Sequence, residues 1–234
     1  MAQRKIIVAV APTGGSVMKD DTPHVPTQPK EIAGVVEECF HLGASMAYLH
    51  VRTPTDAPCC DPAIYSELNK LIRSRCPRMV LNNSTGGGLA GDMVREYAPG
   101  KFEVRFEERL RGLQGGPDVI TVDTSTVIVV RKGKEVVFNT LPSECDALIA
   151  GAHELGIKPE LMGFSAANVT QDINRLIRQD YDKPPLMVNL TIGFPSTTSL
   201  PYTPSILDFM VGLLHRENVV LTITGMGEDA FAAT

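Results

Sequence analysis

Short apolar runs alternate with amphipathic segments along most of this 234-residue chain, and this alternation constrains the fold more than any other feature. The apolar runs have the length of buried strands; they cover 5–12, 47–52, 79–85, 118–126, 159–165, 185–193 and 218–225. Between them, apolar residues recur at helical spacing over 29–42, 62–75, 142–155, 168–179 and 204–215. Strands that alternate with helices predict a parallel sheet covered by those helices.

The number of strand–helix units favours a TIM-type (β/α)8 barrel, an α/β fold, over an open sheet that binds a dinucleotide. The first loop, APTGG (11–15), lacks the G-x-G-x-x-G spacing of dinucleotide sites. An eighth unit is missing from the pattern, so the barrel is open, completed by a partner, or shortened. We expect a single domain over 1–234, with a small β-hairpin inserted at 127–138.

Composition argues against several classes of function. The formal net charge is −5 without a long run of one sign, so nucleic-acid binding through a basic patch is not expected. The chain lacks the long apolar run of a transmembrane helix and the apolar core of a signal peptide. Five cysteines without framework spacing suit a reducing compartment. We therefore expect a cytoplasmic protein that binds neither nucleic acid nor a membrane.

Polar residues stand at the ends of the predicted strands, where the active sites of TIM barrels lie. In AYLHVRTP (47–54), Tyr48, His50 and Arg52 would share one face of a strand. One polar strand end is more often an ordinary loop than a site, but the set together predicts a site, because these ends converge in a barrel. The other members are Gly14, Asn82, Ser84, Gly86, Gly87, Asp123, Glu160 and the residues after Gly225.

Six motifs resemble those of the β-keto acid cleavage enzymes (3-keto-5-aminohexanoate cleavage type), and they occur in the family's order. They are APTGG, DDTPHVP, HVR, NNSTGGG, GIKPELMGF and YTPSILDFM. The resemblance implies a barrel that binds a divalent metal, usually zinc, and converts a β-keto acid and acetyl-CoA into acetoacetate and a new CoA ester. The metal would stabilise enolate-like charge on the keto acid. Because the family is oligomeric and an open barrel exposes strand edges, we expect a homo-oligomer.

The resemblance also implies roles for single residues. Ser84 matches the serine of the family's S-T-G-G turn, where its hydroxyl and the backbone N–H groups that follow would hold a carboxylate or a CoA oxygen. Asp123 falls near a family threonine, within one residue, and Glu160 matches a glutamate that helps to orient substrate or water. The expected catalytic residues are thus Ser84, Asp123 and Glu160, and the expected substrate contacts are Gly14, Asn82, Gly86 and Gly87.

The predicted metal site departs from the family's pattern. Family members carry His-x-His on the second strand, whereas here Tyr48 precedes His50, and a neutral tyrosine is a poor zinc ligand. The tail TGMGEDAFAAT aligns in two ways. One alignment matches Glu228 and Asp229 to the family's R-x-G-x-E-D segment and makes Glu228 a metal ligand; the other, which the count of units favours, lacks that segment. The alternative hypothesis is therefore a catalytically impaired member that acts as a ligand-binding or interaction module.

Overall fold

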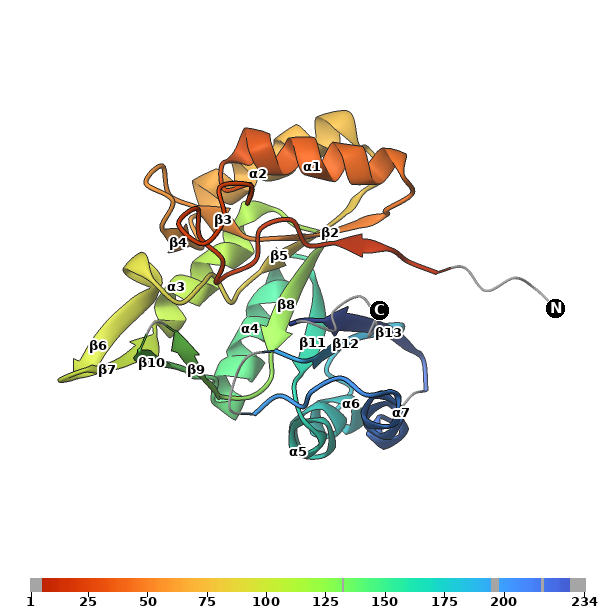
Figure 1. Ribbon diagram of the computed structural model, residues 1–234. Helices are drawn as coiled ribbons and strands as arrows, with labels where there is room; N and C mark the ends of the chain where they lie inside the picture. The colour runs from red at the N-terminus through yellow and green to blue at the C-terminus, as the bar shows by residue number, and fades with distance from the viewer. Residues whose placement is uncertain (1–5, 132, 195–197, 216, 228–234) are drawn as a thin grey trace. The chain divides into compact units, whose positions relative to one another are not determined.

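The computed structural model describes residues 6–131, 133–194, 198–215 and 217–227 (Figure 1). The chain divides into two compact units. The first unit comprises 1–93 and 107–120, and the second comprises 94–106 and 121–234. The main sheet of the chain has seven strands, in the order β1-β2-β5-β8-β11-β12-β13. β8 (Val119–Asp123) begins in the first unit and ends in the second.

In the first unit, neighbouring strands of the main sheet are parallel, as the alternating pattern predicts. The strands are β1 (Ala9–Val10), β2 (Met46–Leu49) and β5 (Val80–Ser84), and the helices are α1 (Pro29–His41) and α2 (Pro62–Arg75). Proline at the first helical position starts both helices. The Asp61 carboxylate caps α2 by accepting hydrogen bonds from the backbone N–H groups of Ala63 and Ile64.

The predicted strand 47–52 is interrupted at His50. β2 ends at Leu49, and β3 (Val51–Arg52) pairs with β4 (Pro58–Cys59) in a separate antiparallel hairpin. The prediction that Tyr48, His50 and Arg52 lie on one continuous strand is therefore wrong. The apolar alternation that suggested it continues into the hairpin, because that hairpin is also buried.

In the second unit, the main-sheet strands are again parallel and in register. The strands are β11 (Lys158–Gly163), β12 (Leu186–Ile192) and β13 (Val219–Gly225). The helices are α4 (Pro142–Glu154), α5 (Ala166–Asn168), α6 (Asn174–Arg178) and α7 (Pro204–Leu213). A π-helical turn at Val169–Ile173 joins α5 to α6, so the helix predicted over 168–179 is present but irregular.

A smaller sheet in the second unit has the strand order β6-β7-β10-β9. β9 (Val127–Arg131) and β10 (Lys134–Phe138) confirm the predicted hairpin at 127–138. β6 (Val94–Ala98) and β7 (Lys101–Val104) were not predicted. α3 (Phe106–Arg111) is the only α-helix between β7 and β8 in the described residues.

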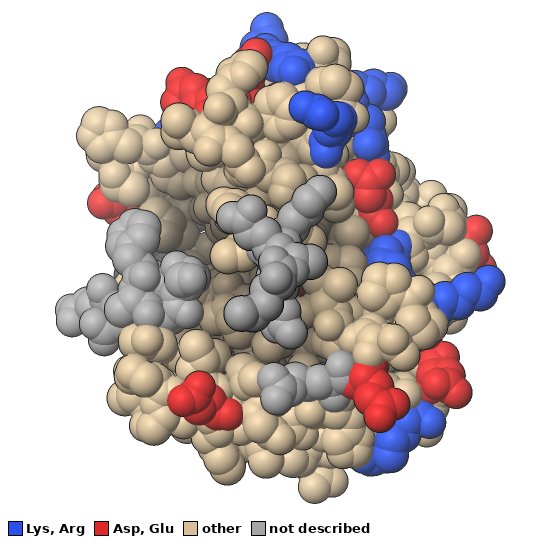
Figure 2. All heavy atoms as spheres, turned by 90° about the vertical axis from the view of Figure 1, so that its right-hand side faces the viewer, with Lys and Arg blue, Asp and Glu red and all other residues tan. Residues whose placement is uncertain are grey.

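The α/β class and the seven-stranded main sheet are consistent with the predicted TIM-type barrel. The first strand is shorter than predicted, and residues 228–234, on which the two alignments of the tail differ, lie outside the described residues. None of the helices in the described ranges is both long and apolar enough to cross a membrane. Figure 2 shows acidic and basic side chains interspersed on one face of the molecule.

Candidate functional site

His50 directly follows β2, and the glycine turn after β5 fixes its imidazole. Its Nδ1 lies 2.9 Å from the carbonyl oxygen of Gly87. Because a carbonyl only accepts, Nδ1 carries the proton and Nε2 keeps its lone pair. Desolvation lowers the pKa of His50 to about 4, although the bond to Gly87 acts in the opposite direction. His50 is therefore a neutral imidazole at neutral pH, with the tautomer and second hydrogen bond typical of a metal ligand.

Two glycine segments, 14–15 and 86–88, approach each other next to this imidazole. A Cβ atom on Gly15 would lie 3.1 Å from the Gly87 carbonyl oxygen and 3.3 Å from His50 Cε1. A Cβ atom on Gly88 would lie 2.6 Å from the Gly15 carbonyl oxygen, and Gly87 has a φ of +60°. A side chain at position 88 would require the Gly15 backbone or Pro58 to move, and the φ of Gly87 favours glycine, so glycines keep the two backbones and the ring close together.

Ser84 and Gly86, two of the residues selected from the sequence, are in direct contact. The buried Ser84 Oγ accepts a hydrogen bond from the Gly86 N–H at 3.1 Å, which orders the start of the glycine turn. A bound carboxylate that used this N–H would replace the serine oxygen as its acceptor. Asn82, two residues earlier on the same face of β5, is fully buried and lies opposite Tyr48 in the parallel register.

Tyr65 is a residue of this region that the sequence analysis missed. It is fully buried on α2, and its hydroxyl lies 2.8 Å from the Ser84 carbonyl oxygen and 3.2 Å from that of Leu49. Tyr65 thereby links the end of β2 to the end of β5. Leu49, at the end of β2, is the residue directly before His50. A tyrosine on the apolar face of a predicted helix was the signal that could have identified it.

Asp123 and Glu160 lie in the second unit. Asp123 ends β8, its side chain is buried, and its backbone carbonyl accepts from the Cys145 thiol at 3.6 Å. Glu160 is fully buried on β11, where its Oε1 accepts a hydrogen bond from the Thr222 hydroxyl at 3.1 Å. Thr222, on β13, is a second residue that the sequence analysis missed. The hydrogen bond from Thr222 therefore fixes the orientation of the buried Glu160 carboxylate.

Near His50, the described residues provide few of the donors that the predicted metal site needs. His50 is oriented as a ligand, and the ring of Tyr48 lies 6.1 Å from it between centroids. The described ranges contain no group of three or more His, Cys, Asp or Glu side chains suited to a metal. Zinc normally has at least three protein ligands. Glu228, the other predicted ligand, lies outside the described residues, so the described donors supply His50 but not a complete zinc site.

A hollow of about 320 Å³ lies at the carboxyl ends of β12 and β13 in the second unit. Its lining includes Phe194, Leu200, Pro201, Tyr202 and Met226, and the Gly193 N–H donates to the Leu200 carbonyl at 2.8 Å. None of these residues was selected as a candidate from the sequence. Two aromatic residues in a loop after a barrel strand were the available signal.

A family model described as beta-keto acid cleavage enzyme matches residues 5–234. The chain is 29% identical over 231 residues to a 3-keto-5-aminohexanoate cleavage enzyme of Fusobacterium nucleatum, covering 97% of this chain and 75% of that protein. It is 26% identical over 221 residues to a 3-oxoadipate:acetyl-CoA acetyltransferase of Cupriavidus necator, covering 94% of this chain and 70% of that protein.

Among solved structures, a binary complex of ObcA with oxaloacetate has a similar fold. The TM-score is 0.63 at 17% sequence identity, over 88% of this chain and 52% of ObcA. The present chain therefore spans about half the length of the ObcA chain and about three quarters of the Fusobacterium protein. At this identity, the likeness to ObcA concerns the fold alone.

Proposed function

The chain belongs to the beta-keto acid cleavage enzyme family, and from this membership we propose that it is an acyltransferase acting on a β-keto acid and acetyl-CoA. In this reaction the bond between C2 and the keto carbon of the acid breaks, and C2 forms a bond to the acetyl carbon. Coenzyme A takes up the released acyl group. The products are acetoacetate and a new CoA ester, so atoms and charge balance without an oxidant or reductant.

The observation that carries the proposal in the chain itself is the arrangement around His50. A neutral imidazole with an unprotonated Nε2 borders two glycine segments, and Ser84 orders one of them. We propose that Ser84, with the N–H groups of Gly86 and Gly87, binds the carboxylate of the keto acid, and that Gly14 and Asn82 also contact the substrate. Backbone N–H groups in such a turn form a concave anion site.

We propose His50 as a ligand of a divalent metal, zinc in the first instance, with Glu228 as a second ligand. Such an ion would supply a Lewis acid for the enolate-like charge of the keto acid. For the second unit, we propose that Glu160 orients substrate or water through the carboxylate that Thr222 holds, and that Asp123 is a further catalytic residue.

The test is a transfer assay with acetyl-CoA labelled with ¹³C in its acetyl group. Purified protein is incubated with β-keto acids of the kinds named for the relatives, 3-keto-5-aminohexanoate and 3-oxoadipate among them. The label should appear in the acetyl half of acetoacetate, together with a new CoA ester. His50→Ala should lower kcat/KM by roughly a hundredfold or more, the scale of losing a positioned catalytic group. His41→Ala, at an exposed position on α1, is the control.

Metal analysis of the same protein separates this proposal from the alternative of an impaired, ligand-binding member. Zinc, manganese or cobalt that binds wild-type protein and is lost in His50→Ala supports the acyltransferase. The proposal is wrong if no keto acid transfers label and no metal binds, while Tyr48→His restores metal binding. That outcome would identify Tyr48 as the substitution that removed the family's activity.

A further inference from the structure

We infer that the β3–β4 hairpin (Val51–Cys59) holds the two glycine segments in place around His50, and that Arg52 is its main positioning residue. Arg52 is 1% exposed. Its Nη2 donates to the carbonyl oxygens of Gly14 at 2.8 Å and Val17 at 3.1 Å. A planar guanidinium holds two carbonyls of one loop in a fixed relative geometry, which a lysine ammonium does not do.

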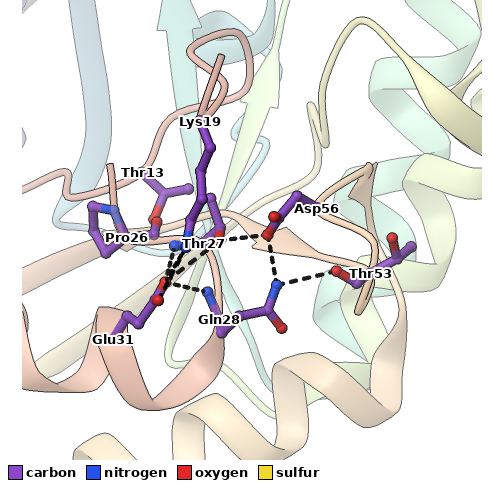
Figure 3. A network of polar contacts seen from close by, with 8 residues as sticks. All are labelled: Thr13, Lys19, Pro26, Thr27, Gln28, Glu31, Thr53 and Asp56. Atoms are coloured by element: carbon purple, nitrogen blue, oxygen red, sulfur yellow. Dashed lines mark hydrogen bonds and ion pairs between the residues drawn. The ribbon is translucent and has the colours of Figure 1, made fainter. Parts of the chain in front are cut away.

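Gly14 and Val17 belong to the loop between β1 and α1, and the last residues of this loop are hydrogen-bonded to the turn of the same hairpin (Figure 3). Asp56 Oδ1 accepts hydrogen bonds from Thr27 Oγ1 at 2.5 Å and from Gln28 Nε2 at 2.7 Å. Gln28 Nε2 also donates to the Thr53 carbonyl oxygen at 3.2 Å. The loop between β1 and α1 is thus held at its start by Arg52 and at its end by the turn at Thr53–Asp56.

A further hydrogen bond joins the first and last parts of this loop directly. Thr13 Oγ1 donates to the Pro26 carbonyl oxygen at 2.9 Å, which joins the first and last parts of the loop (Figure 3). Both residues flank the part of the loop that contains Gly14 and Gly15. A loop with closed ends and fixed carbonyls has little freedom left to lose when a ligand binds.

The second strand of the hairpin borders the other glycine segment. A Cβ atom on Gly88 would lie 2.4 Å from Cβ of Pro58 in β4. One on Gly87 would lie 3.0 Å from Sγ of Cys60, the residue that directly follows the hairpin. Burial raises the pKa of the Cys60 thiol well above its usual range, so this contact is with a neutral thiol. One hairpin, which directly follows His50 in the chain, therefore contacts both glycine segments.

The consequence for function is that the glycine segments are in place before substrate arrives. If Arg52 is lost, the loop occupies its binding position for only a fraction of the time. Apparent affinity then falls by that same fraction, while the chemical step of bound substrate is much less affected. This kinetic consequence rests on the proposed acyltransferase function, whereas the positioning of the loop does not.

Hydrogen–deuterium exchange on substrate-free protein tests the positioning directly. Arg52→Met keeps the length of the side chain and removes its donors. We expect faster exchange in peptides that cover 14–18 and 86–88, and an intermediate rate in Arg52→Lys. Arg73→Met, which removes an exposed arginine that pairs with Asp118, is the matched control and should leave these peptides unchanged. Unchanged exchange at 14–18 in Arg52→Met would overturn the inference.

A second variant covers the case in which Arg52→Met does not fold. Asp56→Gly removes the carboxylate at the tip and suits the φ of +63° at this position. Compared with wild type, Asp56→Gly should accelerate amide exchange in peptides that cover 27–31 more than in peptides from the helices of the second unit. Equal acceleration in all peptides of the chain would indicate general destabilisation and would contradict a local positioning role.

Steady-state kinetics completes the test. Arg52→Met should raise the KM for the keto acid about tenfold, as expected if the loop is in place about a tenth of the time. Its kcat should change much less, and Arg52→Lys should recover part of the loss. An equal fall in kcat with an unchanged KM would overturn the inference. If wild-type protein transfers no label, the proposed function fails, and the exchange experiment still decides the role of Arg52.

Discussion

Close approach, rather than turn formation alone, explains why residues 15 and 88 are glycine. Neither has a positive φ, yet a Cβ atom at either position would enter the space of a neighbouring backbone. Overpacking of this kind cannot be relieved by rotating a side chain, because the obstructing atoms are carbonyl oxygens and a proline ring. The glycine cluster is visible in the sequence, but the atoms that each glycine faces come from segments far away along the chain.

Gly88→Ala should destabilise the protein by about 1–3 kcal/mol, the usual cost of overpacking. Its new methyl group would meet Pro58 Cβ at 2.4 Å and the Gly15 carbonyl oxygen at 2.6 Å. Gly34→Ala on α1 is the matched control, because nothing lies within 4 Å of its Cβ position. It should stabilise by up to about 1 kcal/mol through helix propensity. Urea unfolding of both variants gives the comparison, and equal stabilities would contradict the contact argument.

At the scale of elements, helices could be predicted from the sequence better than strands. α2 was predicted with the same bounds, and α1 and α4 to within one residue, because proline starts and apolar periodicity are local signals. Strand ends depend on which partner is available for pairing, and no local pattern contains this information. The strand that ends at Leu49 and the pair β6–β7 show this limit. For the same reason the bonds of Arg52 to two loop carbonyls could not be foreseen.

The start of α1 predicts a pH-dependent stability. Glu31 Oε2 accepts from the backbone N–H groups of Thr27 and Gln28, and Lys19 Nζ lies 3.0 Å from Glu31 Oε1. The bond from the Thr27 N–H is the largest cause that lowers the pKa of Glu31 from 4.5 to about 2. A carboxylate with a lowered folded-state pKa stabilises above its unfolded-state value, and this stabilisation is lost as the pH falls from about 4.5 to about 2.

Glu31→Gln should therefore be less stable than wild type at pH 7, by roughly 0.5–1 kcal/mol for a partly exposed cap. The difference should shrink steadily below pH 4.5 and vanish near pH 2. Urea unfolding at several pH values measures it, with Glu67→Gln at an exposed position on α2 as the control for loss of charge. A difference that is the same at pH 7 and pH 2.5 would contradict a role for the Glu31 charge.

At the scale of the whole molecule, the alternation of strands and helices was enough to predict seven main-sheet strands and their class of fold. The pattern could not show that the chain divides into two compact units, since that division depends on contact density between distant segments. The same limit applies to the candidate site. His50, Ser84 and the glycines could be proposed from the sequence because they stand at the ends of strands. Tyr65 and Thr222 could not, because only their hydrogen-bond partners, which are distant along the chain, mark them.

Exposed apolar strands at the two ends of the sheet order predict self-association. Within the described residues, β1 pairs only with β2 and β13 only with β12. Ile6, Ile7 and Val8, which precede β1, are 86%, 58% and 54% exposed. All seven residues of β13 are partly exposed, although most are apolar. Unpaired edges and exposed apolar side chains of this kind favour association with another chain.

We therefore predict that light scattering gives a mass of at least twice the 25.3 kDa of one chain, falling on dilution. Ile7→Lys should weaken association without disturbing the core, because this side chain is already exposed and a charge at a strand edge opposes pairing. Leu155→Lys, at a position that is 47% exposed at the end of α4, is the matched control and should leave the mass unchanged. A mass of one chain at every concentration would contradict the argument from exposed edges. A wild-type oligomer that Ile7→Lys leaves intact would instead place the contact away from the β1 end of the sheet.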